Sequence, residues 1–142
     1  VRVVTETTGT SREPASCVLR GSDITDFHQL IRQVYVSEEI ARYAVRLVDA
    51  SRPGRRANLE FVQKWVKWGA GLRASQSLIL GGKARALMHG RFHVSVGDVS
   101  ALAPPILRHR IITNFYAESE KVDSDKLVTQ LLEAVPPPRS EM

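Results

Sequence analysis

Apolar residues recur at intervals of three and four along most of the chain, which is the spacing of amphipathic helices rather than of strands. The first such stretch covers 23–35, and Ser22 precedes it as a candidate N-cap. The second begins after Ser37 and stops at the helix-breaking pair Pro53-Gly54. The apolar positions are Ile24, Phe27, Leu30, Ile31 and Val34 in the first stretch and Ile40, Tyr43, Ala44, Leu47 and Val48 in the second.

The middle of the chain predicts two more helices on either side of a glycine-containing turn. Residues 58–68 are expected to be helical in part, and a longer helix over 73–89 is expected to be the central helix of a bundle. The longer helix contains Gly81-Gly82, and each glycine costs about 1 kcal/mol relative to alanine unless another backbone packs closely there. Three aromatic residues of the shorter segment share one face and are expected in the core: Phe61, Trp65 and Trp68.

A further helix is marked by a capping box, in which Ser95 is the cap and Asp98 follows it at the third helical position. We expect Pro104-Pro105 to end this helix or to begin the next one, because proline cannot donate a backbone hydrogen bond. Residues 113–121 predict a loop, and Asp123 is placed to cap a last helix.

About five or six helices without a convincing strand predict an all-α helical bundle, with room for a short β-hairpin in a loop. We expect residues 1–20 to form a polar linker, 21–138 the helical domain and 139–142 a tail. A chain of 142 residues suits one such domain. Because it opens without an initiator methionine, we expect it to be a piece of a longer protein.

Composition indicates the cellular compartment of this domain. The single cysteine, Cys17, excludes an internal disulfide and fits a reducing compartment, so we expect a cytoplasmic location. No apolar run approaches the roughly 18 residues that a bilayer-spanning helix needs, and no signal peptide is visible.

Positive charge is concentrated in the middle of the chain. Between Arg52 and Arg110 there are eleven lysines and arginines, against two acids, Glu60 and Asp98. This imbalance indicates an anionic partner, whether a nucleotide phosphate, a nucleic acid or an acidic protein surface, although a solvated basic face is an equally simple interpretation.

Several common kinds of site are not supported by the residues present. The histidines at 28, 89, 93 and 109 are scattered without a carboxylate cluster, so we expect no metal site. Neither Cys17 nor the serines at 75 and 77 have a base at a recognisable spacing, which argues against a hydrolase triad.

A phosphate-binding loop is also missing. The pair Gly82-Lys83 has Ser77 where a P-loop needs its first glycine and Ala84 where it needs serine or threonine. The chain therefore has no cradle for a triphosphate, and we expect no ATP hydrolysis from it alone.

Three motifs nevertheless occur in a meaningful order. They are Gly69-Ala70-Gly71-Leu72-Arg73-Ala74, then Gly90-Arg91-Phe92-His93-Val94 with Asp98-Val99, then Ala103 followed by Ile106-Leu107-Arg108-His109-Arg110-Ile111. In this order and spacing they resemble the C-terminal lid of the MoxR family of AAA+ ATPases. The tail 120–138 is similar to the closing helix of that lid, and the opening Thr7-Thr8-Gly9-Thr10 resembles the end of a preceding ATPase core. In the family, proline stands where this chain has Leu72.

The resemblance implies that Arg73, together with Gly71 and Ala74, forms a sensor-2 element that reaches ATP and Mg²⁺ held by the core. A guanidinium suits this role because it is always charged and offers a planar fork of donors to phosphate oxygens. A cation at a helix start costs up to about 1 kcal/mol, which a bound phosphate would more than offset.

The resemblance further implies a ring oligomer, chaperone-like remodelling of protein complexes, and von Willebrand factor A domain proteins as partners. Arg108 and Arg110 have two interpretations: contact with the core or a neighbouring subunit, or cations that favour a helix end.

Two other hypotheses stay open. The basic middle would suit a helical nucleic-acid-binding module, although no predicted helix carries several Arg, Asn or Gln side chains on one face after a tight turn. The chain could also be a free-standing interaction bundle, for which an open reading frame starting near Val1 would be expected.

Overall fold

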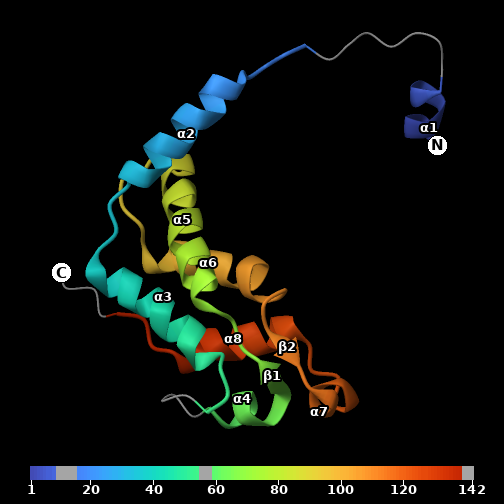
Figure 1. Ribbon diagram of the computed structural model, residues 1–142, viewed down its shortest axis with the longest axis vertical. Helices are drawn as coiled ribbons and strands as arrows, with labels where there is room; N and C mark the ends of the chain where they lie inside the picture. Colours follow the sequence, from blue (N-terminus) through green and yellow to red (C-terminus); the bar gives the residue numbers. More distant parts are fainter. Residues whose placement is uncertain (9–15, 55–58, 139–142) are drawn as a thin grey trace.

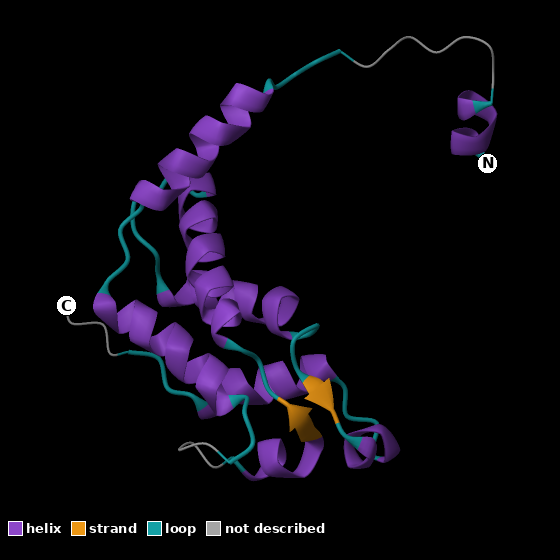
Figure 2. Ribbon diagram, in the orientation of Figure 1, coloured by secondary structure: helices purple, strands orange, loops and turns teal. Residues whose placement is uncertain are grey.

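The computed structural model describes residues 1–8, 16–54 and 59–138, which form eight helices and one two-stranded sheet (Figures 1 and 2). The predicted all-α bundle is confirmed, with more helices than expected. The elements are α1 (Arg2–Thr7), α2 (Gly21–Gln33), α3 (Glu38–Ala50), α4 (Glu60–Trp65), β1 (Val66–Trp68), α5 (Leu72–Met88), α6 (Val96–Leu107), β2 (Ile112–Thr113), α7 (Phe115–Ser119) and α8 (Ser124–Ala134).

Helix α5 is the central helix, as its small residues predicted, and it packs against α2, α3 and α6. The two glycines are explained by side chains of neighbouring segments rather than by a backbone. A Cβ at Gly82 would lie 2.9 Å from Cγ1 of Val94, and one at Gly81 would lie 3.1 Å from Cδ1 of Leu102. Glycine therefore lets α5 and α6 approach more closely than alanine would.

The core is built mainly on α3, α5, α6 and α8. The predicted stripe of α3 is buried, and Ser37 caps that helix by accepting a hydrogen bond from the Ile40 amide at 3.3 Å. Asp123 likewise caps α8 through the Lys126 amide at 2.8 Å, as expected. The largest fully buried apolar side chains are Tyr43, Leu47, Leu78, Leu107, Leu127 and Leu131.

Helix α2 behaves differently from the other long helices. It projects beyond the bundle in Figure 1, none of its residues is buried, and its apolar residues Ile24, Phe27 and Leu30 are 44–49% exposed. The predicted cap was wrong: Arg20, not Ser22, holds the N-cap position. The reason is that the Asp23 carboxylate accepts from the Arg20 amide at 2.8 Å and fixes the start two residues earlier.

The small sheet is not the local hairpin that was expected. Strand β1 pairs antiparallel with β2, which comes from the segment after α6, so the sheet joins distant parts of the chain. Residues two apart on a regular strand share a face, but the pairing register shifts between Val66 and Trp68. Val66 is buried whereas Trp68 is 65% exposed, which corrects its predicted place in the core.

Two boundaries in the second half also differ from expectation. Helix α6 continues through Pro104 and Pro105 to Leu107, so the prolines neither end it nor begin another. The carbonyls that they leave without helical donors are those of Ser100 and Ala101, which are not buried. Within the predicted loop 113–121, Asn114 accepts from the Ala117 amide at 3.1 Å and caps the short helix α7.

The N-terminal segment contains the short helix α1, which lies apart from the bundle in Figure 1. Residues 9 and 10 of the motif at 7–10 and the whole of the tail at 139–142 fall outside the described residues. No helix in the part of the chain that the structure describes combines the length and the apolar character needed to cross a membrane.

Candidate functional site

The loop between β1 and α5 is anchored to the end of α3. The Ala70 amide donates to Oγ of Ser51 at 2.9 Å, and Nε of Arg52 donates to the Ala70 carbonyl at 2.7 Å. Ser51 is fully buried, and its hydroxyl donates in turn to the Val48 carbonyl at 2.6 Å. Both backbone groups of Ala70 are thus satisfied, so the loop that leads to Arg73 has a fixed path.

Close packing makes glycine necessary at the first position of this loop. A Cβ at Gly69 would overlap the carbonyl group of Ser51 and the Cα of Arg52, both of which are backbone. At Gly71, by contrast, a Cβ would meet nothing within 4 Å. The two glycines of the loop therefore provide a matched pair of positions.

Replacing Gly69 by alanine is expected to lower the free energy of unfolding by about 3 kcal/mol, because the added carbon must displace backbone. Gly71→Ala should cost less than about 1 kcal/mol, since it only changes the residue at an N-cap. Urea denaturation of both variants followed by circular dichroism measures the difference. Equal stability of the two variants would contradict the close approach of Gly69 to α3.

The first turn of α5 is positively polarised and carries no internal counter-charge. Gly71 occupies the N-cap position without a capping side chain, and the first turn has no acid. The amides of Leu72 and Arg73 donate to no group in the described part of the chain. The Arg73 side chain is exposed, and no carboxylate whose placement the structure describes lies within ion-pair distance of it. Two free amides and a guanidinium at one helix start form a geometry that suits an anion.

Leu72 occupies the first helical position of α5, where proline is favoured because that amide has no helical partner. Leu72→Pro is expected to raise the free energy of unfolding by about 0.4–1 kcal/mol, since it restricts the unfolded chain. Chemical denaturation measures this gain. Leu80→Pro, inside the same helix, is the control and should cost about 3 kcal/mol or more.

The remaining predicted site residues separate into two groups. Ala74 is buried and its amide donates to the Gly71 carbonyl at 2.9 Å, so its place is within the first turn of α5. Arg110, which follows α6, contacts α5 one turn after Arg73. Oγ of Ser77 accepts from Nη2 of Arg110 at 3.5 Å and donates to the Arg73 carbonyl at 2.8 Å. Arg108 instead forms an ion pair with Asp125 of α8 at 3.0 Å.

A buried ion cluster at the other end of α5 was not predicted. The Asp98 side chain is fully buried and binds Arg91 through two hydrogen bonds of 2.7 Å and Arg85 through one of 2.6 Å. The amide and hydroxyl of Ser95 also donate to it, at 2.9 and 2.8 Å. The Arg91 guanidinium, helped by Ser95 and Arg85, holds the pKa of the Asp98 carboxyl well below its usual range. The motif that contains Arg91 and Asp98 thus connects α5 to α6.

The histidines do not gather into a metal site. His89 lies at the end of α5, with Nδ1 2.8 Å from the Arg85 carbonyl oxygen, and His93 takes part in an isolated backbone bridge with Tyr35. Over the described ranges, no three His, Cys, Asp or Glu side chains are placed to hold a metal ion together.

The bundle with a fixed glycine loop before its central helix defines an AAA+ lid, and residues 60–131 match the AAA lid domain family. The chain belongs to that family. The resemblance to MoxR proteins is confirmed by similarity to Chaperone MoxR1 of Mycobacterium tuberculosis (strain ATCC 25618 / H37Rv), 28% identical over 131 residues, or 92% of this chain and 35% of that protein.

Two other proteins are similar over most of the chain. One is the uncharacterized protein YeaC of Bacillus subtilis (strain 168), 26% identical over 85% of this chain and 35% of its own length. The other is a crystal structure described as a "putative ATPase" from Cytophaga hutchinsonii ATCC 33406, with a TM-score of 0.78 and 30% identity over 83% of this chain and 36% of that one. The chain thus spans about a third of the length of these proteins.

Proposed function

We propose that this chain is the lid of a MoxR-type AAA+ ATPase and that Arg73 is its sensor-2 residue. In this role Arg73 contacts the γ-phosphate of ATP, while a core domain holds the nucleotide and Mg²⁺. The observation that carries the proposal is the exposed guanidinium of Arg73 at the uncapped start of α5, without a carboxylate partner among the described residues.

The electrostatics of this end favour a phosphate. The free amides of Leu72 and Arg73 and the positive end of the α5 dipole attract an anion, and the guanidinium adds two directed donors. Arg52 and Lys67 line a shallow groove of about 420 Å³ that also includes Gly69, so further positive charge lies beside the loop. Positive charge placed where negative charge develops is the main way in which proteins accelerate phosphoryl transfer.

Contact with ATP would also bias the position of the lid. While the γ-phosphate is present, Arg73 would hold lid and core together, and hydrolysis would release that contact. In a ring of subunits such a movement could be passed to a neighbour and used to remodel protein complexes. Arg110, close to Arg73, and Arg108, farther along, remain candidates for contact with the core or a neighbour, and von Willebrand factor A domain proteins are proposed as partners.

The test is steady-state ATP hydrolysis by the full-length protein with and without the Arg73 side chain. A strong loss of turnover supports the proposal, whereas unchanged turnover would remove the sensor-2 assignment. The lid alone should hydrolyse no ATP, because it contains no phosphate-binding loop.

A further inference from the structure

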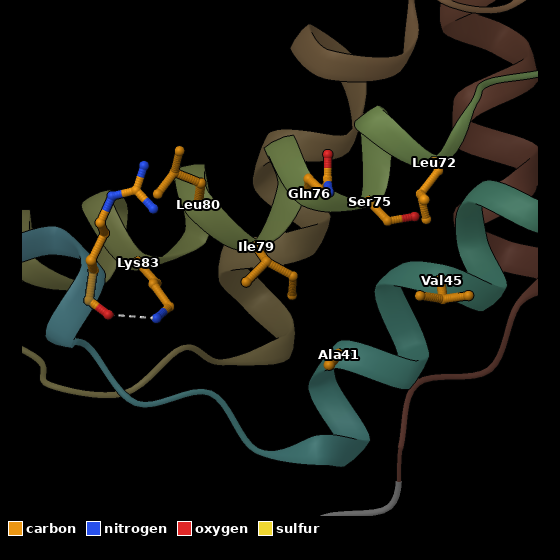
Figure 3. A pocket seen from close by; sticks show the side chains of 9 residues that line it. Ala41, Val45, Leu72, Ser75, Gln76, Ile79, Leu80 and Lys83 are labelled. Atoms are coloured by element: carbon orange, nitrogen blue, oxygen red, sulfur yellow. Dashed lines mark hydrogen bonds between the residues drawn. The ribbon is translucent and has the colours of Figure 1, made fainter. Parts of the chain in front are cut away.

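A groove lies between α3 and α5, away from the buried core (Figure 3). Its volume is about 660 Å³, and its apolar lining comes from Ala41 and Val45 on α3 and from Leu72, Ile79 and Leu80 on α5. Three of these side chains remain about half exposed or more: Val45 at 49%, Leu72 at 65% and Leu80 at 47%. In Figure 3 Leu72 and Ile79 project from α5 toward α3, whereas Leu80 projects to the other side of α5.

One end of the groove is positively charged. Arg32, from the last turn of α2, and Lys83, from α5, complete the lining, and the lining contains no acid. Nζ of Lys83 donates to the backbone carbonyl of Arg32 at 2.9 Å, which joins α5 to the last turn of α2 at this end. Neither side chain forms an ion pair within the part of the chain that the structure describes.

The groove also holds a hydroxyl without a partner. Ser75 is 5% exposed, yet its Oγ forms no hydrogen bond with any described residue, although it lines the space between the helices. Because this hydroxyl lines an open groove, it can donate a hydrogen bond to an incoming molecule or accept one from it. Gln76, one residue further and exposed, adds an amide to the same wall.

We propose that this groove binds an acidic amphipathic helix of a partner protein, with the helix's apolar residues on the α3–α5 floor and a carboxylate at Arg32 and Lys83. An amphipathic helix fits because a groove walled by the side chains of two helices can receive the i, i+3, i+4, i+7 pattern of a third helix. Charge complementarity selects the acidic class, since the open end carries two cations and no compensating acid.

The test uses three synthetic peptides of about 18 residues, long enough to form helix on binding. The first carries leucines at i, i+3, i+4, i+7 and two glutamates near one end, and the second has lysines in place of those glutamates. The third has the same composition as the first, but its leucines are placed so that they do not share one face of a helix. Fluorescence anisotropy of labelled peptides with the 142-residue chain should give about tenfold tighter binding for the acidic striped peptide than for either control, and the charge preference should shrink at high salt.

Variants of the chain locate the binding. Val45→Gln should weaken binding of the acidic peptide at least tenfold, whereas Ile112→Gln, at an apolar residue of β2 with similar exposure, should not change it. Lys83→Glu should reverse the preference in favour of the lysine peptide, and Lys126→Glu on α8 is the charge control. Circular dichroism confirms that each variant is folded.

Four results would overturn the proposal. Equal affinity for the acidic and basic striped peptides removes the charge complementarity, and absence of saturable binding removes the binding site. A dimer in sedimentation that dissociates in Val45→Gln assigns the groove to a second copy of the chain. Binding to this chain but not to the full-length protein assigns the groove to the protein's own remaining domains. None of these results depends on Arg73, so the proposed nucleotide contact is tested separately.

Discussion

Full-length protein carrying Arg73→Ala is expected to hydrolyse ATP about 10²–10³-fold more slowly than the unsubstituted protein. This is the loss that follows when one charged donor is removed from the developing charge of a transition state. The effect should fall mainly on kcat, with a smaller change in KM, because the core would still hold the α- and β-phosphates. Arg73→Lys should recover part of the rate, since lysine keeps the charge but loses the planar fork.

Coupled-enzyme assays over a range of ATP concentrations separate kcat from KM. Lys126→Ala is the control, because it removes an exposed cation of α8, outside the start of α5 and the groove beside it. A rate loss of equal size in Lys126→Ala would indicate a general electrostatic effect instead of a specific contact. Full turnover with Arg73→Ala would show that the exposed guanidinium serves another purpose.

Asp98→Asn is expected to lower the free energy of unfolding by about 3 kcal/mol. Asp98 is fully buried and binds two arginines, so the neutral amide leaves Arg85 and Arg91 without their counter-charge. Both arginines keep about a third of their side-chain surface exposed, which limits the cost. The loss should appear as a lower midpoint in urea denaturation, and Asp125→Asn, at an exposed ion pair, should change stability by less than about 1 kcal/mol.

The same cluster makes a prediction about pH. Because the folded-state pKa of Asp98 is lowered, its contribution to stability is complete above the unfolded pKa of about 3.9 and is lost as the pH falls toward the folded value. Acid denaturation should therefore lower the stability of the unsubstituted chain more than that of Asp98→Asn. Parallel acid sensitivity of the two proteins would show that other carboxylates dominate.

Elements with strong local signals were predicted well. The stripe of α3 and its start after Ser37, the caps at Ser95 and Asp123, and the central position of α5 all follow from short-range spacing, which the fold did not override. Predictions failed where contacts between distant segments determine whether a residue is buried. Trp68 became exposed because a distant strand pairs with its segment, and no local pattern indicates that pairing.

The candidate site shows the same division. The place of Arg73 at the start of a helix could be predicted from the glycine turn before it, and the structure puts it in the second position of α5. The hydrogen bonds that anchor that turn could not be predicted, because they come from Ser51 and Arg52 at the end of α3, and these two residues form no recognisable motif. The Asp98 cluster could have been predicted, however, because Asp98 is one of only two acids in the basic middle and stands in one motif with Arg91.

The two hydrogen bonds of Ala70 have a mechanical consequence. They join the last turn of α3 to the entry of α5, so these two helices meet as one stiff corner rather than at a hinge. A pull applied at Arg73 would then be transmitted along α3 toward its other end instead of being absorbed by the glycines. In the proposed sensor-2 role, this stiff corner would carry a movement of Arg73 into α3, which packs against both α5 and α8.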